Sequence, residues 1–554
     1  MSRLSASLAL ALCFGACTTS LSIATQAGTP LSINPLPIPG GDIRAEHLAR
    51  HLSVLASDAF EGRAPTTEGE RLTVAYISRE FAEAGLSPGG DDGGWTQAVT
   101  LERSRIDGPV TARVHAGGVT RPLANGDDIA VESLHPAGDV DLTGAPLVFA
   151  GYGITAPELD WDDYAGLDVR GKVVVVLIND PDFEAEAPGR FGGRALTLYG
   201  RWTYKYEEAA KRGAAGVLIV HETEPASYPW ATVRNGRAGP QYDIVRADAA
   251  THHLPMRGWM QATVARRLFA DAGLDFDAEK RRAQTAGFRG GALGDATLDI
   301  AFRVQRDRVV SHNVVGVLAG ASRPDETVVL SGHWDSFGIG QPDASGDAII
   351  NGAVDNATAI ASLIELGRVF AAGPRPARTL QFIALTAEEN GLLGATYYAA
   401  NPLRPLDTTA AVLNMEMWST DGETRDISSW GNGRVRSPDP NLEAGLFYRA
   451  DHFAFAQAGV PAITIGPGMD QLDGGVEGGM AARADYFAHR YHQPGDAFDA
   501  SWDMAGPTAD TRTVYRLALA LANSASWPQW EPDSEFHARR ARSDASRTRG
   551  QDAR

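Results

Sequence analysis

The sequence predicts an α/β fold in which a mixed, mostly parallel sheet is sandwiched between helices. From Asn313 onward, short and almost continuously apolar segments alternate with helical patterns, as in sheets that are buried on both faces. Polar side chains of the kinds that bind metals stand directly after these segments. The chain has 554 residues, which is too long for one ordinary core, so two or three units are expected.

The N-terminal segment is typical of an export signal. Arg3 precedes an apolar run over residues 8–14, and small residues follow. Residues 14–17 (Phe-Gly-Ala-Cys) resemble a bacterial lipobox, so lipidation of Cys17 competes with an ordinary cleavage that removes residues 1–27. Either route predicts an exported bacterial protein: periplasmic, secreted, or an outer-membrane lipoprotein. The apolar run is too short to span a bilayer, so membrane anchoring is expected only through a lipid on Cys17.

Two helices are expected next, after a link at residues 30–41 that is rich in Pro and Gly. Apolar spacing predicts the first helix over residues 43–55 and the second over residues 68–84, with Gly85 as its stop. We assign residues 28–129 to the N-terminal part of the main domain.

The middle of the chain predicts a small inserted unit. β-branched segments broken by glycines run from about residue 95 to residue 300. A strand, a helix and a strand are expected over residues 173–177, 205–212 and 216–220. Residues 150–154 and 167–172 resemble the protease-associated domain, a small β-rich module that is not catalytic. We therefore place a protease-associated insert at residues 130–285.

The remaining sequence predicts the main domain and a tail. The clearest buried strands of residues 286–526 are expected at residues 328–330, 380–385, 411–413 and 462–465, with a helix over residues 357–371. Residues 527–554 are rich in arginine and poor in large apolar side chains, which predicts a disordered tail.

The charge balance excludes one class of partner. Fifty Lys and Arg residues face 69 Asp and Glu residues, which makes the formal net charge −19. Nucleic-acid binding requires a basic surface, so no nucleic acid is expected as a partner. We attribute the acidic excess mainly to solubility.

Polar residues at the ends of predicted strands point to a metal site, because reactive groups collect at this edge of an open α/β sheet. Residues of this kind at strand ends, at a helix start or in a late loop are His333, Asp335, Asp355, Glu388, Glu389, Glu416 and His492. Imidazole and carboxylate groups suit Zn²⁺. Five of them could hold two ions with one carboxylate bridging, and such a pair of ions, roughly 3.5–4 Å apart, activates water and polarises a carbonyl group for amide hydrolysis. One of the adjacent pair Glu388 and Glu389 can ligate while the other serves as general base.

Each of these residues alone has a simpler explanation. A single histidine after a strand is more often a hydrogen-bonded residue than a ligand, and Asp355 could cap a helix. His452 could be structural, and Glu388–Glu389 could be an acidic pair at a helix start. The metal site is favoured because so many of the seven candidate residues coincide, most of them at the ends of predicted strands.

The motifs as a set resemble the co-catalytic di-zinc aminopeptidase family, whose relatives include glutamate carboxypeptidase and the transferrin receptor. The motifs that carry the resemblance lie at residues 331–336, 352–357, 387–389, 414–416 and 491–492, with further similarity at residues 58–65, 449–453 and 458–462.

The resemblance implies a role for each candidate residue. Asp355 would bridge two zinc ions, and Glu388 would be the general base. One ion would also bind Glu389 and His492, and the other His333 and Glu416. Asp335 would orient His333. The resemblance also implies a cis peptide bond after Asp355, and Glu416 stands where the family usually has the shorter Asp.

The expected function is therefore an exported zinc aminopeptidase that hydrolyses N-terminal residues from peptides. A metallo-carboxypeptidase, a one-zinc glutaminyl cyclase on the same scaffold and a non-catalytic receptor-like protein are the alternatives. Candidates for the substrate amine are Asp421, Asp426 and Asp451, and candidates for an oxyanion donor are Tyr486 and Tyr491. The sequence leaves open the preferred N-terminal residue, the native metal, the oligomeric state and the role of the insert.

Overall fold

A mixed sheet with four parallel strands at its centre forms the framework of the C-terminal half. The computed structural model describes residues 37–185, 189–430, 445–532 and 534–552. The strand order is β18-β19-β17-β13-β16-β12, in which β19, β17, β13 and β16 run parallel and the two outer strands run antiparallel to their neighbours. The bounds are β12 (Gly291–Leu318), β13 (Arg323–His333), β16 (Arg378–Leu385), β17 (Thr409–Met415), β18 (Ile427–Trp430) and β19 (Ala462–Pro467). The predicted strands at residues 328–330, 380–385, 411–413 and 462–465 are confirmed.

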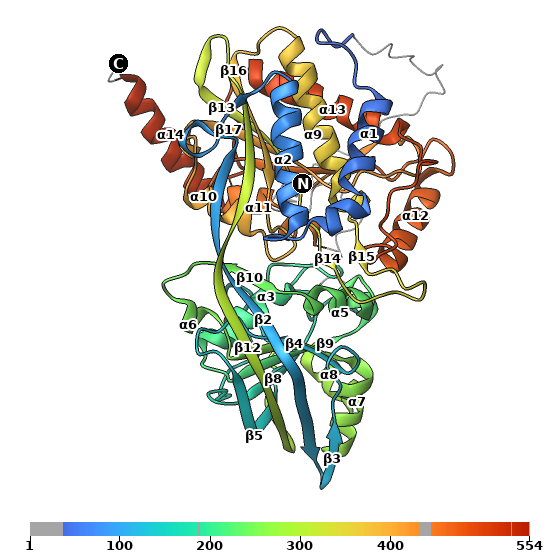
Figure 1. Cartoon of the computed structure of the whole chain (residues 1–554). Helices are drawn as coiled ribbons and strands as arrows, with labels where there is room; N and C mark the ends of the chain where they lie inside the picture. Colours follow the sequence, from blue (N-terminus) through green and yellow to red (C-terminus); the bar gives the residue numbers. More distant parts are fainter. Residues whose placement is uncertain (1–36, 186–188, 431–444, 533, 553–554) are drawn as a thin grey trace, which may run out of the picture. The chain divides into compact units, whose positions relative to one another are not determined.

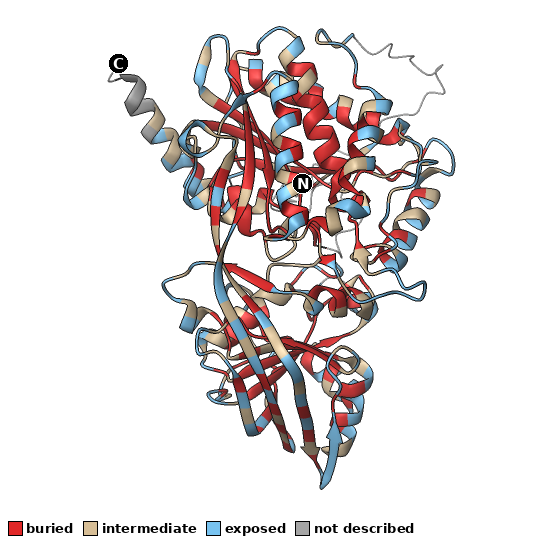
Figure 2. Cartoon of the chain, in the orientation of Figure 1, coloured by how far each residue is buried: buried red, intermediate tan, exposed pale blue. Residues whose placement is uncertain are grey.

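The central strands are covered on both faces. Every residue of β16 and β17 is buried, which explains why their sequences are almost continuously apolar (Figure 2). Helices α1 (Ala45–Leu55), α2 (Glu68–Glu83), α9 (Thr358–Ala372) and α13 (Ala505–Asn523) pack together against the sheet. Helices α10 (Leu393–Ala400) and α11 (His452–Gln457) pack with side chains of alternate strand positions, among them Val329, Ile383 and Val412. The helices predicted over residues 43–55, 68–84 and 357–371 are confirmed with small shifts at their ends.

Strands from the middle of the sequence continue the same hydrogen-bonded sheet beyond β12, and we call this part the second sheet. Its strand order is β5-β8-β9-β11-β4, and three of its four strand pairs are parallel. The bounds are β4 (Ile129–Glu132), β5 (Val140–Phe149), β8 (Val173–Leu177), β9 (Gly216–His221) and β11 (Met256–Gln261), with α3 (Trp202–Lys211) between β8 and β9. The predicted strand, helix and strand of this region are confirmed.

Two long strands join the two sheets. Strand β2 (Thr96–Ala116) pairs antiparallel with β12, from Thr96 opposite Val314 to His115 opposite Thr297 (Figure 1). Strand β12 continues from the second sheet into the first, where its last residues pair with β16. Both sheets belong to one unit of the chain, which begins at Pro39. The predicted borders of the insert at residues 130 and 285 stay predictions, as do the limits of residues 28–129 and 286–526.

The expectation of a disordered tail at residues 527–554 is wrong for the part of it that the structure describes. Helix α14 spans His537–Asp552. The guanidinium groups of Arg378, Arg540 and Arg547 lie 4.9, 5.3 and 3.6 Å from the ring centroid of Trp527. Arg540 is fully buried and donates hydrogen bonds to the main chain at the start of β17. Arginine side chains thus supply the packing that the low apolar content seemed to exclude.

Two further findings concern the membrane and the N-terminus. Among the described residues, no helix combines the length and the apolar composition needed to cross a bilayer. The predicted signal at residues 1–27, with Cys17, lies outside the described residues.

Candidate metal centre

The parallel strands bring four of the predicted residues to one edge of the sheet. His333 is the last residue of β13, and Glu416 directly follows β17. Glu388 and Glu389 come three and four residues after the end of β16, which lies beside β13. Carboxyl ends of neighbouring parallel strands meet at the same edge, so side chains distant in sequence become neighbours in space.

Asp355 lies at the centre of the cluster. It belongs to a turn of π-helix at Ala353–Ala357 that leads into α9, and the peptide bond between Asp355 and Asn356 is cis, as expected. Its Oδ1 lies 3.1 Å from Nε2 of His333, and its Oδ2 lies 3.4 Å from Nε2 of His492. One carboxylate therefore faces a different imidazole with each oxygen, which is the arrangement a bridging ligand needs.

The other predicted ligands complete two groups around Asp355. His333, Asp355 and Glu416 form one group, and Asp355, Glu389 and His492 form the other; in each group the ligand atoms lie within 4.8 Å of one another. Nε2 of His492 is 3.1 Å from Oε2 of Glu389, and Nε2 of His333 is 3.4 Å from Oε2 of Glu416. All five predicted ligands are thus brought together.

The longer side chain of Glu416 is held by two amides. Asn414 donates to its Oε1 at 3.1 Å, and Asn356 donates to its Oε2 at 2.7 Å. These bonds hold the extra methylene in one conformation and aim the carboxylate at His333.

Asp335 makes different contacts from those expected. Nδ1 of His333 lies 3.1 Å from the main-chain oxygen of Asp335 and 3.7 Å from its carboxylate. The carboxylate instead accepts hydrogen bonds from the backbone N–H groups of Glu388 and Glu389, at 3.1 and 3.3 Å. Asp335 therefore contacts His333 mainly through its carbonyl group, and its side chain positions the loop after β16.

The side chains around His492 come from both halves of the protein. The ring of Phe337 lies 4.4 Å from that of His492, measured between centroids. Asn235, on α5 (Trp230–Ala238), donates to the main-chain oxygen of His492 at 3.0 Å, and Thr232 contacts the oxygen of Tyr491. A helix from within residues 130–285 therefore contacts the loop that carries one predicted ligand.

The buried charges influence one another strongly. Burial raises the pKa of Glu389 to about 7, although His492 opposes this shift. Burial lowers the pKa of His492, but Glu389 and Asp355 raise it to about 9. Burial also raises the pKa of Glu388 well above its usual range. The cluster places more carboxyl groups than imidazoles in a buried position, which requires a compensating cation.

The cluster fits a divalent metal by its chemistry and by its unsatisfied atoms. Among the described residues, Oε1 of Glu389 and Nε2 of His492 are buried without a hydrogen-bond partner of good geometry. The close approach of His492 to two carboxylate oxygens is therefore not explained by hydrogen bonding alone. Nitrogen and oxygen ligands at this spacing suit zinc, so the residues present fit the ion that the sequence predicted.

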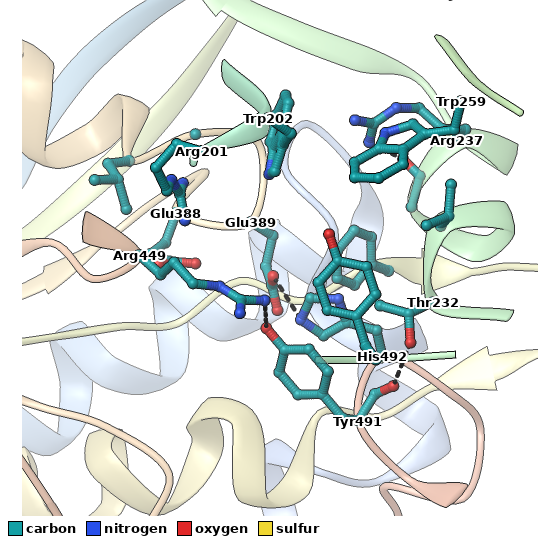
Figure 3. A pocket seen from close by; sticks show the side chains of 16 residues that line it. Arg201, Trp202, Thr232, Arg237, Trp259, Glu388, Glu389, Arg449, Tyr491 and His492 are labelled. Atoms are coloured by element: carbon teal, nitrogen blue, oxygen red, sulfur yellow. Dashed lines mark hydrogen bonds and ion pairs between the residues drawn. The ribbon is translucent and has the colours of Figure 1, made fainter. Parts of the chain in front are cut away.

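A pocket opens beside the cluster. Glu388, Glu389 and His492 line it together with three arginines, Arg201, Arg237 and Arg449, and with aromatic side chains that include Trp202, Trp259 and Tyr491 (Figure 3). Arg201 and Arg449 lie beside Glu388, and both exert electrostatic effects on it. Residues from within 130–285 therefore form part of the wall.

The other sequence candidates have mixed outcomes. Tyr491 lines the pocket, whereas the hydroxyl of Tyr486 donates to Asp496 at 3.1 Å. None of the three amine candidates lines this pocket: Asp426 accepts from backbone N–H groups of a neighbouring loop, Asp451 is fully buried, and Asp421 lines another pocket. His452 is buried, with Nδ1 2.6 Å from the hydroxyl of Thr464, which agrees with a structural role.

Three residues at the site were not identified from the sequence. Arg201 reaches it from the middle of the chain, and no local pattern marks it. Arg63 and Asp496 contact the segment around Asp355 from outside the cluster. Arg63 stands in the segment 58–65 that the sequence analysis singled out, and Asp496 follows the predicted ligand His492 by four residues, but no role was assigned to either.

The fold is an α/β sheet that carries, at the carboxyl ends of its parallel strands, a cluster of imidazole and carboxylate groups that could hold metal ions. Comparison with known families agrees with this: residues 313–515 match Peptidase family M28.

Individual relatives agree with this placement. The chain is 29% identical over 184 residues to a "Probable zinc metalloprotease" of Pyrenophora tritici-repentis, which covers 33% of this chain and 42% of that protein. It is 32% identical over 144 residues to "Aminopeptidase NAALADL1" of Mus musculus, which covers 25% of this chain and 16% of that protein. The chain thus spans less than half the length of these relatives. The solved aminopeptidase from Aneurinibacillus sp. strain AM-1 is 19% identical with a TM-score of 0.52, over 89% of this chain and 97% of that one, and it shows the shared fold.

Proposed function

We propose that this protein is an exported zinc aminopeptidase that removes residues from the N-termini of peptides, with two metal ions and Glu388 as general base. The observation that carries the proposal is the position of Asp355, whose two oxygens face the separate groups of His333 with Glu416 and of Glu389 with His492. Export rests on the N-terminal sequence alone.

The proposal assigns separate roles in metal binding, proton transfer and oxyanion stabilisation to residues of the site. His333, Asp355, Glu389, Glu416 and His492 would hold two zinc ions, which would polarise the scissile carbonyl group and lower the pKa of the attacking water. Glu388 lines the pocket beside these ligands, so its carboxylate can accept the proton of the attacking water and deliver it to the leaving amine. Tyr491 also lines the pocket, where its hydroxyl can donate to the developing oxyanion.

The first test is elemental analysis of the purified protein, combined with a panel of aminoacyl chromogenic amides and N-blocked controls, before and after chelation. We expect two metals per chain and hydrolysis of free but not blocked N-termini. Chelation should abolish this activity because the proposal assigns the activation of the attacking water to the bound metal ions, and added zinc should restore it.

The other outcomes identify the alternatives. One metal per chain with conversion of N-terminal glutamine would indicate a glutaminyl cyclase. Release of C-terminal residues only would indicate a carboxypeptidase. A protein that binds no metal and hydrolyses none of the substrates would be the non-catalytic form.

A specific observation keeps the carboxypeptidase as the second candidate. Arg201 lines the pocket beside Glu388, and among the described residues no side-chain hydrogen bond or ion pair holds its guanidinium group. A guanidinium group pairs well with a carboxylate. The pocket therefore suits a substrate that presents a carboxylate close to the scissile bond, such as a short peptide with a free C-terminus.

Replacing Arg201 with Met tests this reading of the pocket. We expect KM for short peptides with a free C-terminus to rise at least tenfold, because a hydrogen bond to a charged group contributes about 1.5–3 kcal/mol. KM for the same peptides with an amidated C-terminus should not change. Arg190→Met, which changes an exposed arginine that does not line the pocket, is the control. Equal effects on both peptide series would exclude carboxylate recognition by Arg201.

A further inference from the structure

A strained turn at Glu61–Arg63 contacts the segment that leads to Asp355. Glu61, Gly62 and Arg63 all have positive φ angles, of 49°, 66° and 51°. Such angles are costly for residues other than glycine and persist only where the surroundings enforce them. A Cβ atom on Gly62 would lie 2.4 Å from the carbonyl oxygen of Ile350, so the turn is pressed against the strand that leads toward Asp355.

The turn at Glu61–Arg63 places the side chain of Arg63 in the protein interior. Arg63 is 1% exposed, and its guanidinium group donates four hydrogen bonds, all of them to main-chain carbonyl groups. The acceptors and distances are Leu55 at 2.7 Å, Trp334 at 2.8 Å, Asn351 at 2.6 Å and Gly352 at 2.8 Å. The planar fork of arginine can serve acceptors in several directions at once, which the single ammonium group of lysine does less well.

Three of the four acceptors, Trp334, Asn351 and Gly352, belong to the two segments that carry Asp355 and His333. Trp334 lies between His333 and Asp335, while Gly352 lies three residues before Asp355. One side chain therefore ties the end of β13 to the turn before α9. The spacing of these two segments determines the distance between the imidazole of His333 and the carboxylate of Asp355.

The turn before α9, which carries Asp355, is also held by an acidic residue, Asp496. Asp496 accepts hydrogen bonds from the backbone N–H groups of Val354 and Asp355, at 2.9 and 3.1 Å. Asp496 also exerts the largest stabilising electrostatic effect on Arg63, followed by Asp335 and Asp355. The segment before and at Asp355 is thus fixed by a buried cation at its carbonyl groups and by a buried anion at its N–H groups.

We propose that Arg63 is a positioning residue that holds the His333 and Asp355 segments at the spacing required for zinc and thereby sets the affinity of the site for the metal. The inference rests on the proposed metal site. Loss of the guanidinium group would leave buried carbonyl groups unpaired and would let the two segments shift. Changes in residues that orient ligands typically weaken metal binding 10- to 100-fold.

The experiment compares apo forms of the full chain and of the variants Arg63→Met and Arg63→Lys. Zinc affinity is measured by competition with a chromophoric chelator, and the zinc-induced rise in the unfolding temperature is measured in parallel. We expect Arg63→Met to bind zinc at least tenfold more weakly than the unaltered protein and to show a smaller rise. Arg63→Lys should recover part of the lost affinity because it can still donate to some of the carbonyl groups.

Arg540→Met is the matched control. Arg540 is also fully buried, and it also donates to main-chain carbonyl groups, those of Thr409 and Ala410, at the end of β17 that is remote from Glu416. This variant should be less stable than the unaltered protein, yet its zinc affinity should change less than twofold. The comparison separates the loss of any buried arginine from the loss of this one.

The outcomes are decisive for the role of Arg63. If Arg63→Met binds zinc as tightly as the unaltered protein, or no more weakly than Arg540→Met, the positioning role is refuted. If Arg63→Met does not fold, the zinc affinity of Arg63→Lys decides by the same comparison. If the unaltered protein itself binds no zinc, the proposed function has failed, which is a different result from a failure of this inference alone.

Discussion

Glu388→Ala is expected to lower turnover at least 100-fold while leaving the fold and the zinc content nearly unchanged. Glu388 lines the pocket, and its Oε2 lies 3.9 Å from Nε2 of His333, farther than the nearest oxygens of Asp355 and Glu416. Its removal should therefore take away proton transfer rather than metal binding. A 100-fold loss corresponds to about 2.7 kcal/mol of transition-state stabilisation, within the range of general-base catalysis. The measurements are kcat, zinc content by elemental analysis, and circular dichroism.

The neighbouring glutamate supplies the control for this prediction. Glu389→Ala removes a carboxylate that lies 3.1 Å from His492, so this variant should lose zinc as well as activity. If Glu388→Ala retains more than a tenth of the turnover, Glu388 is not the base. If it loses zinc as Glu389→Ala does, Glu388 is a ligand, a role that its place in a group with His333 and Glu389 would also permit.

Asp355→Ala is expected to abolish binding of both metal ions, because both ligand groups depend on this one carboxylate. Zinc content should fall from two ions to fewer than one per chain, and activity should fall with it. Zinc should no longer raise the unfolding temperature, since a ligand stabilises a protein only in proportion to its binding to the folded state. Zinc content and thermal unfolding with and without added zinc are the measurements.

An exposed aspartate serves as the control for Asp355. Asp473→Ala makes the same chemical change at the surface and should leave zinc content and unfolding temperature unaltered. A variant Asp355→Ala that still binds two ions would refute the bridging role. Loss of only one ion would instead show that the second group holds its ion without Asp355.

Part of the candidate site was predictable from the sequence because several of its residues follow buried strands. His333, Glu388 and Glu416 each come after a segment whose apolar character marks it as a central strand, and the geometry of parallel sheets then brings their positions together. His492 lies in a loop and was assigned through the family resemblance; the structure places it 3.4 Å from Asp355. The roles of these residues as ligands and base stay proposals until metal is measured.

The errors and omissions have a common origin. The C-terminal segment was expected to be disordered because large apolar side chains are few, whereas the buried Arg540 donates hydrogen bonds to the main-chain oxygens of Thr409 and Ala410. Asp335 was predicted to orient His333, whose Nδ1 lies 3.1 Å from its main-chain oxygen, but the role of its carboxylate in holding the backbone of the loop after β16 was missed. In each case the contact is a polar or cationic side chain meeting a partner far away in sequence, and no periodicity reveals such pairs.

By itself the sequence determined the α/β class, the order of the central strands along the chain and the residue types at their ends, because burial and strand geometry leave regular traces in apolar patterning. The tertiary structure alone decided how Arg201 reaches the pocket from the middle of the chain, and how Arg63 and Asp496 hold the turn at Asp355 from opposite sides. These contacts join segments separated by more than one hundred residues. Such contacts depend on directional hydrogen bonds and on charge at close range, and these take effect only when the folded chain has brought the groups within a few ångströms.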